Sequence, residues 1–321
     1  MTPAALSLPG GALPPGITRD RPLAPLTSFK IGGPAAFFAE PADAAALAVC
    51  LDFASRYGLP VLVLGGGTNL LVADAGFPGL VVRCGTRTWS VEPGPGGAVL
   101  RAGARAPLAA MARDTARSGW MGLEWAEGIP GTVGGAVVGN AGAFGGEIAA
   151  VFRRATCYAP DSGEMTLTAA DLAFVYRGSA LRDAPPGTRF LLAAEFSLST
   201  GDAEVLQSQM RDYAARRRAH TPAGASCGSV FKNPPGDHAG RLIEAAGLKG
   251  AEAGAAIVSP IHANYIVNRG GATAGDILAL IERIRSTVRE RFGVTLELEV
   301  RLVGFAESVP REHPQAGTDV H

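Results

Sequence analysis

The stretch GIPGTVGGAVVGNAGAFGGEI, residues 128–148, has eight glycines in 21 residues, and this density constrains the fold more than any other part of the chain. Glycine weakens both helices and strands, because it has no side chain to pack and loses the most backbone freedom on folding. We therefore expect a loop over 128–148 whose backbone approaches a ligand closely. The alternative is a glycine loop with a structural role only.

Ahead of this stretch the chain alternates short strands with one helix. Apolar runs predict strands at 35–41, 60–64 and 79–83. The periodic segment 43–58 predicts a helix closed by Gly58. This alternation is typical of a small α/β unit.

Two more regions follow, and each mixes helices with strands. The second region, from about 85 to 200, contains a predicted helix at 107–118 and predicted strands at 97–103, 153–159, 164–168 and 189–198. The third region follows a predicted helix at 202–220 and contains predicted helices at 239–246 and 274–292 and strands near 255–259 and 264–268.

The run VTLELEVRL, 294–302, alternates cleanly and predicts a strand with one apolar and one polar face. The apolar face has Val294, Leu296, Leu298, Val300 and Leu302, and the polar face has Thr295, Glu297, Glu299 and Arg301. The polar face is either solvated or carries a Glu whose pKa is tuned by burial and by a nearby Arg.

A second glycine turn, GGGTNLLV at 65–72, follows a predicted buried strand. Converging N–H groups in such a turn can bind a pyrophosphate, because no Cβ blocks the approach. The turn matches neither GxGxxG nor the GxxxxGK[ST] pattern, so a dinucleotide-binding Rossmann fingerprint and a P-loop are both absent. The alternative is a tight strand-to-loop connection.

Two short motifs contain reactive or charged side chains. In YRGS, 176–179, the Arg can hold a carboxylate or a phosphate in a bidentate manner, although a surface Arg is the ordinary interpretation. In SCGSVFKNP, 226–234, Ser229 lacks a GxSxG elbow, an SxxK partner and a nearby His, so a serine hydrolase is poorly supported. Cys227 is best interpreted as a small packed residue.

The charge balance and the cysteine positions argue against several classes of protein. Lys+Arg and Asp+Glu both number 29, so no positive field favours nucleic acid or an anionic membrane. The four cysteines are far apart, and no His/Cys cluster predicts a metal site. The N-terminal residues lack a signal-peptide pattern, and the chain has no apolar run long enough to span a membrane, so we expect a cytoplasmic protein.

Eight motifs in this order and spacing resemble the UDP-N-acetylenolpyruvoylglucosamine reductase (MurB) family. They are SFKIGG, GGGTNLLV, GIPGTVGGAVVGNAGAFGGEI, YRGS, GSVFKNP, AGRLIEAAGLKG, HANYIVN and LELEVR. The resemblance runs from about Thr27 to Gly304 and so covers nearly all of the chain but its ends.

The resemblance implies an α+β fold: a two-part FAD-binding module of the vanillyl-alcohol oxidase (PCMH) type, followed by an α+β substrate-binding domain. The boundaries we expect are a flexible tail at 1–20, FAD-binding subdomains at 21–84 and 85–205, a substrate-binding domain at 206–304 and a flexible tail at 305–321.

The resemblance also implies the chemistry. NADPH reduces bound FAD, and hydride then passes from flavin N5 to the terminal enolpyruvyl carbon of UDP-N-acetylglucosamine enolpyruvate, which gives UDP-N-acetylmuramate for peptidoglycan synthesis. By this resemblance Arg177 binds and polarises the substrate carboxylate, Glu299 helps to stabilise the enolic intermediate, and Ser229 donates the proton to the adjacent carbon.

The same resemblance assigns binding residues. The expected FAD contacts are Gly65, Gly66, Gly67, Thr68, Asn69, Gly128, Ile129, Pro130, Gly134, Gly135, Asn140, Ala141 and Gly142. The expected substrate contacts are Tyr176, Lys232, Asn233, Lys249, His262 and Asn264. We expect a UDP-sugar as the partner molecule, and a monomer or a weak homo-oligomer.

Only PGDH separates FKNP from AGRLIEAAG, so the chain resembles the shorter subtype that lacks a tyrosine loop closing over the substrate. Two alternatives remain at this point. One is another flavin oxidase or dehydrogenase of the same fold that acts on an alcohol or a sugar. The other is a nucleotide-binding protein that has kept the fold without catalysis.

Overall fold

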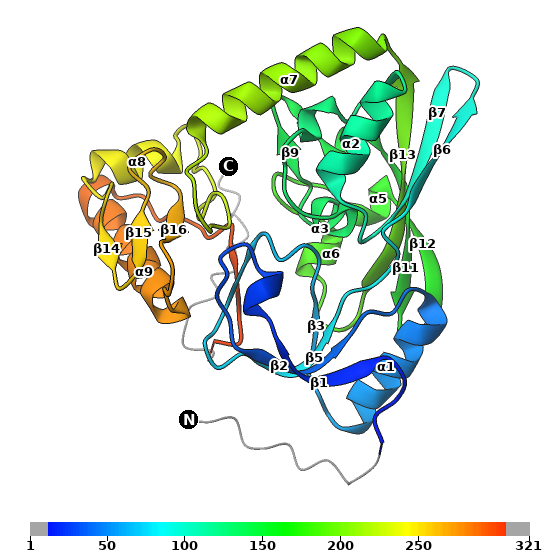
Figure 1. The fold of residues 1–321 in the computed structure, drawn as a ribbon, viewed down its shortest axis with the longest axis horizontal. Coiled ribbons are helices and arrows are strands. Elements are labelled where there is room, and N and C mark those ends of the chain that lie inside the picture. The colour runs from blue at the N-terminus through cyan, green and yellow to red at the C-terminus, as the bar shows by residue number, and fades with distance from the viewer. Residues whose placement is uncertain (1–11, 306–321) are drawn as a thin grey trace, which may run out of the picture.

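Residues 12–305 are described by the computed structural model and form three regions that follow one another along the chain (Figure 1). The first region, in blue, lies at the bottom of the view, the second, mostly green, at the right, and the third, yellow to orange, at the left. Helix α7 (Ala203–His220) runs across the top from the second region to the third. No helix within residues 12–305 is long and apolar enough to cross a membrane.

The first region is a four-stranded sheet with one helix. The strand order is β1-β2-β5-β3, in which β1 is antiparallel to β2 and the other pairs are parallel. The Asp43 side chain starts α1 (Ala44–Arg56) by accepting a hydrogen bond from the Ala46 N–H at 2.8 Å. The predicted strands and helix are confirmed here. The other elements of this region are β1 (Ile17–Pro22), η1 (Ala24–Leu26), β2 (Pro34–Ala39), β3 (Val61–Val63), β4 (Leu70–Val72) and β5 (Phe77–Val82).

The tail expected over 1–20 is wrong for its last four residues, because β1 begins at Ile17 and pairs with β2. Its sequence ITRDRP is polar, and only Ile17 is buried, so the strand has no apolar pattern of its own. Backbone pairing to the edge of the sheet is what orders it. Residues 1–11 and 306–321 lie outside the described residues.

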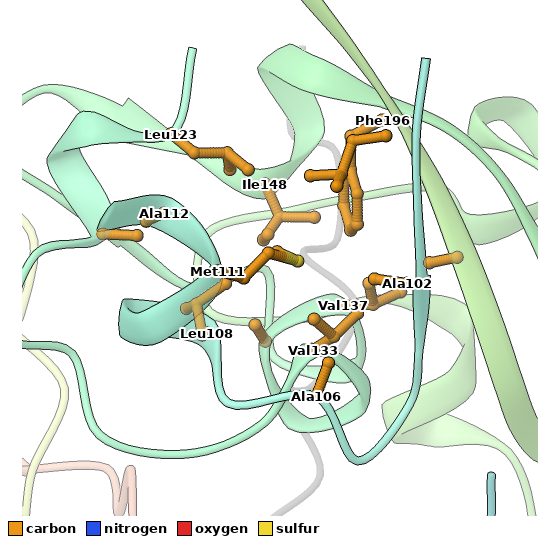
Figure 2. Packing of buried hydrophobic residues seen from close by; sticks show 14 of the residues in the cluster. Ala102, Ala106, Leu108, Met111, Ala112, Leu123, Val133, Val137, Ile148 and Phe196 are labelled. Carbon is orange, nitrogen blue, oxygen red and sulfur yellow. The ribbon is translucent and has the colours of Figure 1, made fainter. Parts of the chain in front are cut away.

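The second region is an antiparallel sheet with the order β12-β11-β13-β7-β6, and β8 pairs with the end of β13. Its core contains Met111, which lies among Leu123, Val137 and Ile148 (Figure 2). The predicted strands and helix are confirmed. The elements are β6 (Trp89–Gly94), β7 (Gly97–Gly103), α2 (Leu108–Arg117), β8 (Trp120–Met121), η2 (Glu124–Ala126), β11 (Phe152–Ala159), β12 (Gly163–Thr168), α5 (Ala169–Leu172), α6 (Ala180–Asp183) and β13 (Phe190–Thr200).

The expectation of a loop throughout 128–148 is wrong in part. This stretch contains α3 (Val133–Val138), the short strands β9 (Gly142–Ala143) and β10 (Gly146–Glu147), and the start of α4 (Ile148–Val151). Helix α3 forms despite its two glycines because Val133, Ala136 and Val137 are buried in the core. Burial of these side chains outweighs the low helix propensity of glycine.

The third region is a small α+β unit whose strand order is β14-β15-β16. The expected boundary at 205/206 is misplaced, because Leu206 and Met210 of α7 are buried in the core of the second region. The core of the third region draws on residues from Cys227 onward, together with Phe29, Ile31 and Leu71. Its elements are α8 (Ala239–Ala245), β14 (Glu252–Ala253), β15 (Ala256–Val258), β16 (Ile266–Asn268) and α9 (Ala274–Phe292).

The strand predicted over 294–302 is only partly confirmed. Its five apolar residues all contact the core of the third region, as the alternation predicts. Regular strand structure is limited to β17 (Arg301–Val303), because within residues 12–305 the preceding segment pairs only through an isolated bridge between Leu298 and Phe231 and the backbone hydrogen bonds on either side of it. Strand β17 pairs in parallel with β4, so the segment after Glu299 returns to the glycine turn 65–72.

We predict that Met111→Ala destabilises the protein by about 2–5 kcal/mol, because it leaves a cavity in a fully buried core position. Met121→Ala is the matched control, since that side chain is 40% exposed, and we expect a change within about 0.5 kcal/mol. Urea unfolding of both variants measures the difference. Equal effects would contradict the packing in Figure 2.

Candidate active site

A cavity of about 710 Å³ lies where the three regions meet, and all three contribute to its wall. The first region provides the turn 65–70, the second provides parts of 128–143 and Arg177, and the third provides the segment 226–229 and Glu299. A volume of this size is within the range of small-molecule and cofactor sites.

The glycine turns at 65–72 and 128–135 contact each other at this cavity. The sequence predicts that both bind the same ligand. The Thr68 hydroxyl donates a hydrogen bond to the carbonyl of Pro130 at 3.4 Å. A Cβ on Gly66 would lie 2.8 Å from the Cα of Gly131, so the two backbones touch. Gly67 has φ +64°, and a Cβ there would collide with the carbonyl of Leu26.

This wall fits FAD, because it offers backbone groups along a long face and few bulky side chains. Of the expected FAD contacts, all but Asn140 line the cavity. Asn140 is buried, and its side chain donates to Glu147 and to the carbonyl of Val175 and accepts from the N–H of Ala149. Its side chain therefore supports the YRGS turn, and the expected FAD contact of Asn140 stays a prediction.

Arg177 lies at the tip of a tight turn. Val175 and Gly178 exchange two backbone hydrogen bonds of 3.1 Å, and Arg177 has φ +58°. A left-handed conformation of a non-glycine residue costs about 1–3 kcal/mol, and such residues cluster at functional sites. The turn directs this Arg into the cavity wall.

Arg177 and Glu299 form an ion pair, in which Nε lies 3.3 Å from Oε1 of the carboxylate. The N–H does not point at the carboxylate, so Nε is buried without a hydrogen-bond partner among residues 12–305. The Nη1 group donates to the carbonyl of Gly142 at 3.0 Å. The guanidinium is thus held in place while one of its donors is still available.

The Glu299 backbone is held by all three regions. Its N–H donates to the carbonyl of Val230 at 2.9 Å. Its carbonyl accepts from Nδ2 of Asn69 at 2.9 Å and from Nη2 of Arg182 at 3.3 Å. The position of the carboxylate therefore depends on how the three regions are assembled.

Burial raises the pKa of the Glu299 carboxyl above its ordinary value, and the positive charge of Arg177 offsets this only in part. Desolvation disfavours the ionised form, whereas a cation favours it. A carboxyl tuned in this manner at a cavity wall is typical of a functional site.

Ser229 lines the cavity beside Tyr265, and an isolated antiparallel bridge joins the two residues. Within residues 12–305 its hydroxyl makes no hydrogen bond to a protein group. Asn264 is buried and clamps the same segment, because its side chain accepts from the Phe231 N–H at 2.9 Å and donates to the Phe231 carbonyl at 2.8 Å. The structure therefore places Asn264 behind Ser229 and not in the cavity wall.

The remaining expected substrate contacts do not line this cavity. Tyr176 is 58% exposed on the tip of the YRGS turn. Lys232 and Lys249 are ion-paired with Glu297 at 3.2 Å and Glu244 at 2.7 Å.

Asn233 and His262 serve local structure. The Oδ1 of Asn233 accepts from the Ala239 N–H at the start of α8, at 3.1 Å. The Nδ1 of His262 accepts from the Asn264 N–H at 3.2 Å, and burial lowers the pKa of this His.

Among the cavity residues that the sequence predictions do not include are Arg182, Arg217 and Tyr265. Arg182 donates to the carbonyl of Arg177 at 2.6 Å, and the YRGS motif alone does not reach it. Arg217 belongs to a run of three arginines near the end of α7, which is ordinarily interpreted as a solvated face. Within the described part of the chain, no cluster of His, Cys, Asp or Glu could hold a metal ion.

Family models divide the chain into two matched parts. Residues 35–167 match the model of an FAD binding domain, and residues 220–303 match the model of the UDP-N-acetylenolpyruvoylglucosamine reductase C-terminal domain. The first match covers both glycine turns, and the second covers Ser229 and Glu299.

Known reductases with this C-terminal domain are similar to nearly the whole chain. UDP-N-acetylenolpyruvoylglucosamine reductases from Chloroflexus aggregans and Chloroflexus aurantiacus are 47% and 48% identical, over 91% of this chain and 99% of each relative. The crystal structure of the reductase from Thermus caldophilus superposes with a TM-score of 0.75 and 34% identity, and covers 89% of this chain and 98% of that one.

The fold, the glycine-lined cavity and the matched FAD binding domain define an FAD-dependent oxidoreductase, as the sequence predicts. The matched C-terminal domain, and relatives that match over most of the chain, then identify the family of oxidoreductases. The chain belongs to the UDP-N-acetylenolpyruvoylglucosamine reductase family.

We predict that Glu299→Gln raises the stability of the protein at neutral pH. A carboxyl whose pKa is raised on folding stabilises the folded state while protonated and loses that contribution as the pH rises through its folded pKa. The variant should therefore unfold at a higher temperature than the wild type at about pH 8, and the gap should close below the ordinary Glu pKa of about 4.3.

Glu297→Gln is the control for this prediction, because its side chain is 64% exposed on the same segment. Thermal unfolding across pH measures all three proteins. A Glu299→Gln variant no more stable than the Glu297→Gln variant at about pH 8 would contradict the prediction.

We also predict that Cys227 resists alkylation in the folded protein. Burial and the nearby charge of Glu299 raise the pKa of this thiol, so the reactive thiolate is scarce at neutral pH. Iodoacetamide labelling followed by mass spectrometry should find Cys227 unmodified in buffer and modified in urea. Rapid labelling in buffer would contradict this expectation.

Proposed function

We propose that the chain catalyses the NADPH-dependent reduction of UDP-N-acetylglucosamine enolpyruvate to UDP-N-acetylmuramate, a step of peptidoglycan precursor synthesis. The observation that supports it best is the grouping of Arg177, Glu299 and Ser229 on the wall of one glycine-lined cavity. These three residues come from two regions that are far apart in sequence, and the family's chemistry requires all three side chains.

The glycine turns 65–69 and 128–135, together with Ala141 and Gly142, are the groups that would hold FAD. FAD, when bound, takes a hydride from NADPH and supplies it to the enolpyruvyl group. The chain's own task is then to bind the substrate anion, stabilise the charge that develops next to its carboxylate, and deliver one proton.

Arg177 binds the substrate carboxylate, and its Nε, although ion-paired with Glu299, makes no hydrogen bond within residues 12–305. A guanidinium fixed by the Gly142 carbonyl needs no reorganisation when the anion arrives, which favours stabilisation of the transition state. Glu299, 3.3 Å from this guanidinium, keeps it oriented and balances its charge. Its raised pKa also makes Glu299 easier to protonate when negative charge accumulates on the substrate.

Ser229 donates the proton to the carbon next to the carboxylate. A serine hydroxyl is a weak acid, so this role needs a strongly basic, carbanion-like centre aimed at the hydroxyl. The bridge to Tyr265 and the clamp by Asn264 fix the Ser229 backbone on the cavity wall. No protein group competes for the hydroxyl within the described residues.

The contacts expected for Tyr176, Lys232, Asn233, Lys249, His262 and Asn264 are also part of the proposal, although these residues lie outside the cavity wall. Lys232 and Lys249 pair with carboxylates that are 64% and 58% exposed. Exposed ion pairs contribute about 0–1 kcal/mol, so phosphate oxygens could replace these partners at little cost.

Other functions fit less well. An alcohol or sugar oxidase of the same fold has no use for a proton donor opposite an Arg–Glu pair. A serine hydrolase needs a base next to Ser229, and neither His220 nor His262 lines the cavity. A cytoplasmic location remains part of the proposal, supported by four unpaired cysteines. The expectation of a monomer or a weak homo-oligomer stays a prediction.

We predict that Ser229→Ala separates the two halves of the reaction. NADPH should still bleach the flavin at the wild-type rate, because Ser229 has no part in that step. Reoxidation by the enolpyruvyl substrate should slow about 10²–10⁴-fold, the usual contribution of a positioned proton donor. Rapid-mixing absorbance measurements resolve the two rates.

Ser226→Ala is the matched control, since Ser226 lines the same cavity three residues away. We expect both of its half-reactions to stay near the wild-type rates. Unchanged reoxidation in Ser229→Ala would remove Ser229 from the mechanism. If the wild-type protein with FAD does not oxidise NADPH faster when the substrate is added, the proposed function is wrong.

A further inference from the structure

The hairpin formed by β9 and β10 has an unusual tip. Its two central residues, Phe144 and Gly145, have φ +52° and +86°. Positive φ at both positions is the requirement of a type I′ turn, for which Asn-Gly or Gly-Gly is the preferred pair. A Phe at the first position is strained, so something other than turn preference must favour its ring.

The ring of Phe144 has an aromatic and a cationic neighbour. It lies parallel to the ring of Tyr213 from α7, with centroids 4.3 Å apart and an angle of 4° between the planes. The guanidinium carbon of Arg217 lies 5.6 Å from the centre of the Phe144 ring. Tyr213 and Arg217 are one helical turn apart, so both reach the same ring.

Arg217 lines the cavity and contacts Gly128 at the start of the glycine-rich stretch 128–148. A Cβ on Gly128 would lie 2.8 Å from the Cδ of Arg217, so the Arg stem packs on that glycine. Its Nε is buried without a hydrogen-bond partner among residues 12–305. Burial lowers the pKa of Arg217, and the nearby charge of Arg177 acts in the same direction.

A buried guanidinium with an unused donor is costly unless an anion completes it. Arg177 has Glu299 as a carboxylate partner and, by the proposed function, the substrate carboxylate as a second one. A UDP-sugar also carries a diphosphate, whose oxygens match the planar donors of an Arg. The diphosphate is therefore the anion that the second guanidinium would take.

We propose that Phe144 and Tyr213 are positioning residues, whose stacked rings hold the Arg217 guanidinium in the cavity wall to receive the substrate's diphosphate. The proposal rests on the proposed function for the identity of the substrate. It accounts for a strained, 38% exposed Phe at a turn position that favours Asn. The strain is tolerated because the ring supplies a face on which the Arg lies.

The first experiment uses UDP as the probe and the FAD-loaded protein, with calorimetry as the readout. We expect Phe144→Asn and Tyr213→Leu each to weaken UDP binding about fivefold, the size of one cation–π contact. Phe144→Asn should nevertheless unfold at the wild-type temperature or above, because Asn suits the turn. Weaker binding together with undiminished stability would exclude simple unfolding as the cause.

Matched variants test the geometry. Phe144→Tyr keeps a ring face and should bind UDP within about twofold of the wild type. Tyr57→Leu removes another tyrosine that contacts a phenylalanine ring at a helix end, outside the cavity lining, and should leave UDP binding unchanged. In an Arg217→Ala background, Phe144→Asn should cause no further loss, because the two changes act through one group.

Several results would overturn the proposal. These are wild-type UDP affinity in both Phe144→Asn and Tyr213→Leu, additive losses with Arg217→Ala, or no UDP binding by the wild-type protein. A shift in the NADPH dependence of flavin reduction without a change in UDP affinity would assign Arg217 to the co-substrate instead. Failure of the proposed function appears separately, as UDP binding without substrate-dependent NADPH oxidation.

Discussion

The parallel pairing of β17 with β4 is the contact on which the site depends. It brings β17, which begins two residues after Glu299, back to the glycine turn 65–72. The carbonyl of Glu299 is then within reach of Asn69, and its N–H is within reach of Val230. One short ladder therefore fixes the carboxylate relative to both the flavin module and the proton donor.

The charged groups of the site are arranged at the expense of stability. Arg177 and Arg217 each lie near an aromatic ring, and within residues 12–305 each has a buried Nε that makes no hydrogen bond. Glu299 is desolvated beyond what its cationic neighbour offsets. Selection for stability alone would pair these guanidinium donors and this carboxylate with other protein groups. A protein that binds a ligand with two anionic groups instead leaves them available for that ligand.

Much of the fold follows from local sequence signals. Helices with long periodic patterns, such as α1 and α9, are predicted well, because their caps and apolar faces lie within one segment. The polar strand β1 and the glycine-rich helix α3 are not, since tertiary pairing and burial order them against their own propensities. The same holds for the site: motifs point to Arg177 and Ser229, whereas the contact of Arg217 with Phe144 joins residues that are distant in sequence.

Helix α7 connects the second region to the third, and cavity residues lie in both. It starts in the core of the second region and stays helical to His220, and Ser229 follows only after the short segment 221–225. A rotation of the third region about that segment would move Ser229 and leave Arg217 beside Gly128. Under the roles proposed above, binding of the anion and delivery of the proton would then be separable, and the complete site would form only with the third region docked against the other two.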